Sequence, residues 1–175
     1  MTNELEKSAA FRQTLNESAR LLQANRPGEA ITLLEPLWDQ APGNVDVAIN
    51  LGGALILQRK WNRAEAILRQ ATTANPHNIM LWTNLAAAHL GNLETAGPKQ
   101  QERAIAAYEK ALALDPQAPN IHYHLGLIYK ERRDWRNAIA YFEQALAVAP
   151  NDRDARRWLD QINAIRADEA DSEQP

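Results

Sequence analysis

Asparagine side chains recur at a fixed interval in the first half of the chain. Asn16, Asn50 and Asn84 are equally spaced, and His124 follows Asn84 after an interval that is six residues longer. A side-chain amide offers a hydrogen-bond donor and an acceptor, so it can pair with the NH and CO groups of an extended peptide of any sequence. One such bond contributes only about 1 kcal/mol, and micromolar affinity needs about 8 kcal/mol, so further contacts are required. The pattern suggests reversible peptide binding, with hydrogen bonds between neighbouring structural units as the alternative role.

The residue types that catalysis and metal binding require are absent or unsuitably spaced. The chain has no cysteine, and its seven glycines form neither a GxGxxG nor a GxxxxGK loop. The serines have no neighbouring histidine in the sequence that could activate them. His122 and His124 are two residues apart, so on a helix their side chains point about 200° apart and cannot share a metal. His89 occupies a position that we expect to be packed in the core. We therefore predict no catalytic residue, no metal and no cofactor, and so a protein that is not an enzyme.

The charge balance and hydropathy exclude two further classes of partner. The net charge is -3, and no apolar run approaches the roughly 20 residues that a membrane helix needs. The N-terminal segment lacks the apolar core of a signal peptide, so we expect a cytoplasmic protein without membrane insertion. Two arginine clusters, 132–136 and 153–157, are interleaved with acidic residues. This mixture favours a solvated surface over nucleic-acid binding.

The elements that must position the asparagines are repeats of one helical hairpin. The prolines that close the units have equal first and last intervals and a middle interval six residues longer, and these are Pro42, Pro76, Pro116 and Pro150. Two further series share the same three intervals: Ala30, Ala64, Ala104 and Ala138, and Leu37, Ala71, Ala111 and Ala145. The shorter interval, a period of about 34 residues, is typical of paired antiparallel helices that bury their faces by stacking on neighbouring pairs.

The residues at these positions resemble the tetratricopeptide repeat family over roughly Phe11 to Ile165. The fourth unit carries the family pattern in nearly every place, as Leu125, Gly126, Tyr129, Ala138, Phe142, Ala145 and Pro150. Only His122 departs from it, standing where the family often has the tryptophan that the third unit supplies as Trp82. The first unit is the weakest match, and its polar first helix suits the end of an array. The resemblance implies an all-α fold, a right-handed solenoid of antiparallel helical hairpins.

The repeats divide the chain into a predicted single solenoid, 4–166, and a disordered acidic tail, 167–175. We expect repeats at about 11–44, 45–78, 79–118 and 119–152, followed by a capping helix at 153–166. The first helix is predicted from about residue 4 to residue 24. Asn44 and Asn78 are predicted N-caps, and Pro119 is predicted at the first helical position of the fourth repeat. Six extra residues before Ala104 are expected to widen the turn within the third repeat.

The resemblance also implies where a ligand would bind, because in this family the first helices line the concave side. The helical period then assigns a groove to residues on the exposed side of these helices. The predicted groove residues are Arg12, Asn16, Ile49, Asn50, Met80, Thr83, Asn84, Asn120, Tyr123, His124 and Leu127. Some family members clamp an acidic chain terminus with cations in this groove. Such a clamp is not expected here, because Leu15, Ile49, Thr83 and Tyr123 stand where the cations would cluster.

The resulting hypothesis is a non-catalytic adaptor that binds an extended segment of a protein or peptide partner in its concave groove. Two alternatives remain open from the sequence. One is an assembly module that forms homo-oligomers through convex or end surfaces. The other is a fragment of a larger enzyme, which would require a cofactor-sized pocket that the sequence does not encode.

Overall fold

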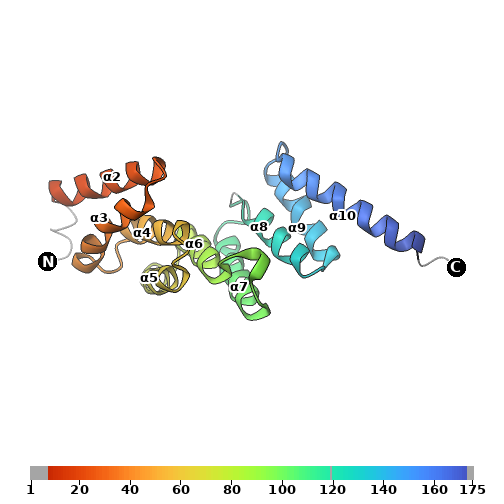
Figure 1. Cartoon of the computed structure of the whole chain (residues 1–175), viewed down its shortest axis with the longest axis horizontal. Coiled ribbons are helices and arrows are strands. Elements are labelled where there is room, and N and C mark those ends of the chain that lie inside the picture. The colour runs from red at the N-terminus through yellow and green to blue at the C-terminus, as the bar shows by residue number, and fades with distance from the viewer. Residues whose placement is uncertain (1–7, 119, 173–175) are drawn as a thin grey trace. The chain divides into compact units, whose positions relative to one another are not determined.

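The computed structural model describes residues 8–118 and 120–172, with side chains described as far as Arg166, and this part of the chain is helical without strands (Figure 1). The helices are α2 (Ala9–Gln23), α3 (Pro27–Gln40), α4 (Val45–Leu57), α5 (Trp61–Ala74), α6 (Ile79–Leu90), α7 (Pro98–Leu114), α8 (Ile121–Glu131), α9 (Trp135–Val148) and α10 (Arg153–Ser172), with a short 3-10 helix η1 (Leu93–Thr95). Within these described residues, every helix is too short or too polar to span a lipid bilayer.

The helices group into two compact units. Unit 1 ends at Leu114 and contains α2 to α7, whereas unit 2 begins at Asp115 and contains α8 to α10. The sequence predicts one solenoid over 4–166, and the boundary between the two units lies where the third predicted repeat passes into the fourth. The repeat boundaries themselves stay predictions.

In unit 1 every helix packs against the next, and the first helices of successive hairpins also contact one another. These additional contacts join α2 to α4 and α4 to α6. The core contains apolar side chains at helical spacing, among them the fully buried Leu34, Leu51, Leu55, Leu68 and Leu81. Stacking of this kind buries the face that a single hairpin would leave in water.

Two glycines mark the closest approach of the helices within a hairpin. A Cβ atom added at Gly52 in α4 would lie 2.7 Å from Leu68 Cδ2 of α5. One added at Gly126 in α8 would lie 2.7 Å from Phe142 Cε1 of α9. Both partner side chains are fully buried, so glycine is required for these helices to pack this closely.

The predicted N-caps of α4 and α6 are confirmed. Asn44 Oδ1 accepts from the Val47 amide and Asn78 Oδ1 accepts from the Leu81 amide, each at 3.0 Å. The helix of the fourth repeat starts differently, because Asn120 precedes it with φ 64° and α8 begins at Ile121. Asparagine tolerates this left-handed conformation better than most residues. The prediction that the helix begins at residue 119 is therefore wrong, and Pro119 itself lies outside the described residues.

The ends of the first and last helices also differ from the prediction. Ser8 caps α2 by accepting from the Phe11 amide at 3.1 Å, so the helix begins at Ala9, and the predicted residues 4–7 lie outside the described part. At the other end α10 continues to Ser172, past the predicted end at 166. No Gly or Pro interrupts 167–172, and Ala and Glu are good helix formers. The predicted disorder is therefore wrong for 167–172, and 173–175 lie outside the described residues.

The six extra residues of the third repeat are shared between a loop and a helix. α7 begins six residues before Ala104, whereas α5 and α9 begin three residues before Ala64 and Ala138. The rest of the surplus forms the connector that contains η1, where Asn92 Oδ1 accepts from the Glu94 amide at 2.9 Å. The expectation that the insertion only widens the turn is therefore wrong in part, because half of it extends α7.

A hydrogen bond to the carbonyl of the closing proline recurs at the same place in the period. Trp82 Nε1 donates to Pro76 O at 2.8 Å, and His122 Nε2 lies 2.8 Å from Pro116 O. Arg156 of α10 donates to Pro150 O at 2.9 Å. His122 thus takes the place of Trp82 in the fourth repeat, and α10 begins as the first helix of a further repeat would.

Candidate peptide-binding face

The candidate site in unit 1 is the exposed side of the three first helices, α2, α4 and α6, which we call the amide face. Asn16 is exposed, and Asn50 and Asn84 are half-buried. Within the described chain, neither Asn16 nor Asn50 forms a side-chain hydrogen bond, so their donors and acceptors are available to a ligand. Asn84 Nδ2 donates to Ile49 O of α4 at a long 3.4 Å. The amide of Asn84 therefore serves the contact between hairpins, which is the alternative role that the sequence leaves open, while its Oδ1 accepts no bond from any described residue.

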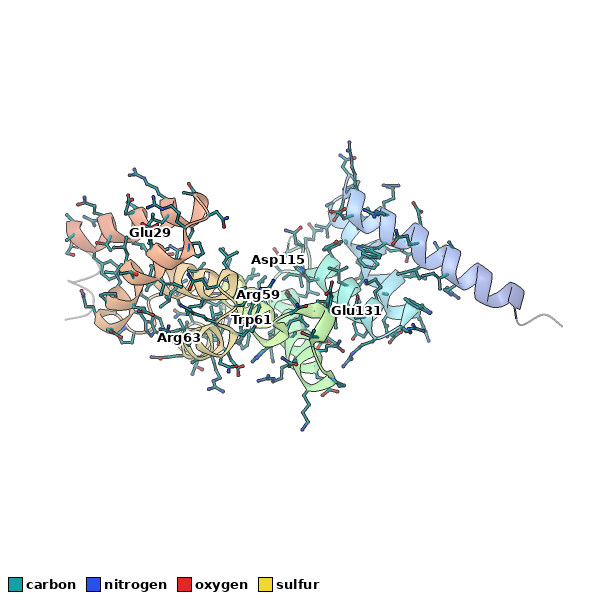
Figure 2. All side chains as sticks on the ribbon, viewed as in Figure 1. Glu29, Arg59, Trp61, Arg63, Asp115 and Glu131 are labelled. Atoms are coloured by element: carbon teal, nitrogen blue, oxygen red, sulfur yellow. The ribbon has the colours of Figure 1, made fainter. Side chains whose placement is uncertain are left out.

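Open space and exposed apolar side chains complete the amide face. A Cβ atom added at Gly53, three residues after Asn50, would meet no atom within 4 Å. Leu57 at the end of α4 is 59% exposed and Met80 at the start of α6 is 58% exposed. The labels Arg59 and Trp61 in Figure 2 mark the turn that follows Leu57. The face therefore combines amide groups, room for a chain and two apolar contacts.

The remaining predicted groove residues of unit 1 are Thr83, Ile49 and Arg12. Thr83 Oγ1 donates to Ile79 O at 2.9 Å within its own helix, and Ile49 packs against the core. Arg12 is exposed and shares a shallow hollow of about 470 Å³ on α2 with Asn16.

In unit 2 the predicted residues occupy a different environment. Tyr123 packs against Phe142, with ring centroids 5.8 Å apart, and also against His124, at 5.9 Å. Burial lowers the pKa of His124 and favours the neutral ring. Leu127 packs partly against the core, while the exposed Asn120 lines a cavity of about 170 Å³ with Tyr123. The fourth repeat therefore does not continue the amide face with the same chemistry.

A charged cluster that sequence patterns did not indicate joins three helices of unit 1. Arg103 Nη1 of α7 lies 3.1 Å from Glu65 Oε1 of α5, and His89 Nδ1 of α6 lies 3.5 Å from Glu65 Oε2. Burial lowers the pKa of His89, and the Glu65 carboxylate opposes that shift. The cluster links α7 to α5 and α6.

A second hollow that the sequence prediction missed lies in unit 2, between the end of α8, the start of α9 and α10. We call it the α10 pocket; its volume is about 240 Å³. A sequence signal for it exists, because Trp158 follows His124 by the same interval that separates Asn50 from Asn84. The prediction treats residues 153–166 as a cap alone and so does not extend the groove register into α10.

Stacked helical hairpins with a polar face on their first helices define a helical-repeat interaction module. The chain belongs to the tetratricopeptide repeat family: Tetratricopeptide repeat families match residues 21–92 and 119–152, and a TPR repeat family matches 99–132. Members of this family are typically non-catalytic scaffolds that bind protein partners.

Several relatives and solved structures are similar to this chain. A peroxisomal targeting signal receptor of Eremothecium gossypii is 26% identical over 71% of this chain, which spans only 26% of that receptor. The uncharacterized protein y4yS of Sinorhizobium fredii is 30% identical over 55% of this chain and 51% of its own length. Residues 41 to the end of MamA from Desulfovibrio magneticus RS-1 superpose with a TM-score of 0.76 at 20% identity, covering 92% of this chain and 88% of that one. A thermophilic TPR protein of Thermus thermophilus gives 0.75 at 19% identity, with 89% and 82% covered. These likenesses show a solenoid of tetratricopeptide hairpins.

Proposed function

We propose that this protein is a non-catalytic adaptor that binds an extended segment of a protein partner on the amide face of unit 1. The observation that carries the proposal is that Asn16 and Asn50, on adjacent first helices, have no side-chain hydrogen-bond partner among the described residues, beside the open space at Gly53. Asn84 keeps its Oδ1 available, although its Nδ2 donates to Ile49 O. A peptide laid along this face would offer backbone NH and CO groups to these amides. The cytoplasmic location expected from the sequence belongs to the same proposal.

The composition of the amide face sets the kind of recognition. Its hydrogen-bonding groups are mostly neutral amides, with Arg12 as a charged exception, so binding should depend little on salt. Leu57 and Met80 would add apolar contacts that the amides alone cannot supply. One relative is named as a receptor for a targeting signal, which agrees with a binding role, and this chain spans only 26% of that receptor.

The test replaces the two central amides together, as Asn50→Ala with Asn84→Ala. Proteins captured by the wild-type chain from a lysate of the source organism are identified, and the affinity of one of them is measured by calorimetry. The double variant should bind about 1 to 3 kcal/mol more weakly, because peptide groups lose their partners. The matched control is Asn62→Ala, an exposed asparagine on the second helix α5, which should bind as the wild type does.

An obstacle variant provides a second arm. Gly53→Phe fills the open space with a bulky side chain and should block binding while leaving the core intact. Full-strength binding by both the double variant and Gly53→Phe would reject the amide face. A molar mass that rises with concentration in light scattering, and is lost in Gly53→Phe, would instead assign the face to self-association.

A further inference from the structure

Some residues of the α10 pocket stand in unit 2 at the repeat positions that carry the amide face in unit 1. Trp158 follows His124, and Ile165 follows Glu131, by one regular repeat interval. The pocket is lined by Lys130, Glu131, Arg133, Trp135, Trp158, Gln161, Ile162 and Ile165. Trp158 thus presents an indole at the repeat position where Asn50 and Asn84 present amides.

Apolar side chains from two helices form the wall of this pocket. Ile162 is buried, Trp135 and Trp158 are half-buried, and Ile165 is 42% exposed. A volume of about 240 Å³ falls below the roughly 300 to 1,000 Å³ of small-molecule sites, so the pocket has the size for a single inserted side chain. Trp135 and Trp158 supply the large rigid surfaces that such an insertion favours.

The charges at the pocket leave one cation without a partner among the described side chains. Lys130 Nζ lies 2.7 Å from the Glu131 carboxylate and 4.0 Å from the centre of the Trp158 ring. Figure 2 labels Glu131 at the end of α8. The single carboxylate among the lining residues is therefore already paired. Arg133 is exposed and forms no ion pair with any described residue. An approaching acidic group would find the Arg133 guanidinium, which no described carboxylate occupies, beside an apolar wall.

We propose that the α10 pocket binds one leucine-sized apolar side chain of an acidic partner segment. The apolar side chain lies against Trp135, Trp158 and Ile165, and an adjacent aspartate or glutamate pairs with Arg133. The pocket belongs to unit 2, so this proposal does not rest on the amide face of unit 1.

The experiment uses the full chain and three capped pentapeptides as probes: a leucine flanked by glutamates, an alanine flanked by glutamates, and a leucine flanked by lysines. Binding is followed by the NMR signals of the Trp135 and Trp158 indole NH groups during titration to millimolar peptide. We expect the acid-flanked leucine peptide to shift both signals and the other two to bind much more weakly. Added salt should weaken the binding, because an ion pair contributes to it.

Variants connect the signal to the pocket. Ile165→Ser and Arg133→Glu should each lower the affinity for the acid-flanked leucine peptide by about tenfold, since each removes one central contact. Arg133→Lys keeps the charge and should retain most of the affinity. The matched control is Arg153→Glu, the same charge reversal at an exposed position of α10 outside the pocket, which should bind normally. Circular dichroism checks that every variant keeps its helices.

Several results would overturn the proposal. These are equal binding of the lysine-flanked peptide, unshifted indole signals, or full affinity in Ile165→Ser. Dimerisation that Ile165→Ser abolishes, without peptide binding, would make a second copy the occupant and also reject it. The Asn50→Ala, Asn84→Ala double variant should bind the acid-flanked leucine peptide normally, so failure of this proposal and failure of the amide face are separate outcomes.

Discussion

Units 1 and 2 use one packing scheme to present two different surfaces. Gly52 against Leu68 in unit 1 and Gly126 against Phe142 in unit 2 are the same contact at the same place in the period. On the exposed side, Asn50 in unit 1 corresponds to Trp158 in unit 2 after whole repeats. Interior positions are fixed because one added methyl group would collide with a neighbouring buried side chain. Exposed positions can change without loss of stability of the fold. The interior contact therefore repeats between the two units, whereas the chemistry of the exposed positions changes from one repeat to another.

The largest expected effect is a loss of stability when one large buried side chain is removed from the core of one unit. Phe142→Ala should lower the stability of unit 2 by about 3 to 5 kcal/mol, because a fully buried ring leaves a cavity. Hydrogen exchange resolved by segment should show faster exchange in 120–172 and little change in 8–114. Leu68→Ala is the counterpart in unit 1 and should reverse this pattern. Equal loss of protection in both segments would mean that the units unfold together.

Two neighbouring glycines of α4 lie on different sides of the helix: Gly52 faces the interior and Gly53 faces open space. Gly52→Ala should destabilise unit 1 by about 1 to 3 kcal/mol, because its methyl group would meet the side chain of Leu68. Gly53→Ala should stabilise it by about 0.5 to 1 kcal/mol, because the space is open and alanine favours the helix. Urea unfolding of the two variants measures the difference, and effects of the same sign would contradict it.

A smaller effect is expected from the bond to the closing proline. Trp82→Phe removes the donor to Pro76 O and should cost about 0.5 to 1.5 kcal/mol. His122→Phe removes the corresponding bond but also a buried Nδ1 that has no hydrogen-bond partner among the described residues, so it should cost less. Thermal unfolding of both variants tests this order, and a larger loss for His122→Phe would show that the imidazole stabilises the unit in another way.

The smallest expected effect concerns pH, where each unit holds one partly buried histidine with a lowered pKa. Burial lowers the pKa of both His89 and His124, so the unfolded chain binds protons more readily than the folded one. Their contribution to stability is therefore full above about pH 6.5 and is lost as the pH falls through the lower folded values. Urea midpoints compared at about pH 7.5 and about pH 5.5 should fall on acidification. His89→Gln and His124→Asn should each reduce that dependence, and an unchanged profile in both would contradict the assignment.

Local signals in the sequence determined the repeat and most of its helices. The closing prolines, the small residues at fixed places and the caps Asn44 and Asn78 act within a few residues, so their effect can be read without knowing the fold. The start of α8 was predicted wrongly because Asn120 adopts a left-handed conformation, so the helix begins only at Ile121. The end of α10 was predicted wrongly because an acidic composition, which favours disorder, competes with helix-forming residues.

Only the tertiary structure decided which hydrogen bonds and hollows the exposed residues form. The sequence places Asn50 and Asn84 in equivalent positions, yet packing gives Asn84 a bond to Ile49 O and leaves Asn50 without one among the described residues. The α10 pocket likewise requires Lys130, Trp135 and Trp158, which come from three helices. Such contacts depend on distances between segments that are far apart in the chain. A periodic sequence specifies that the hairpins stack, but it does not specify which spaces between side chains remain open after stacking.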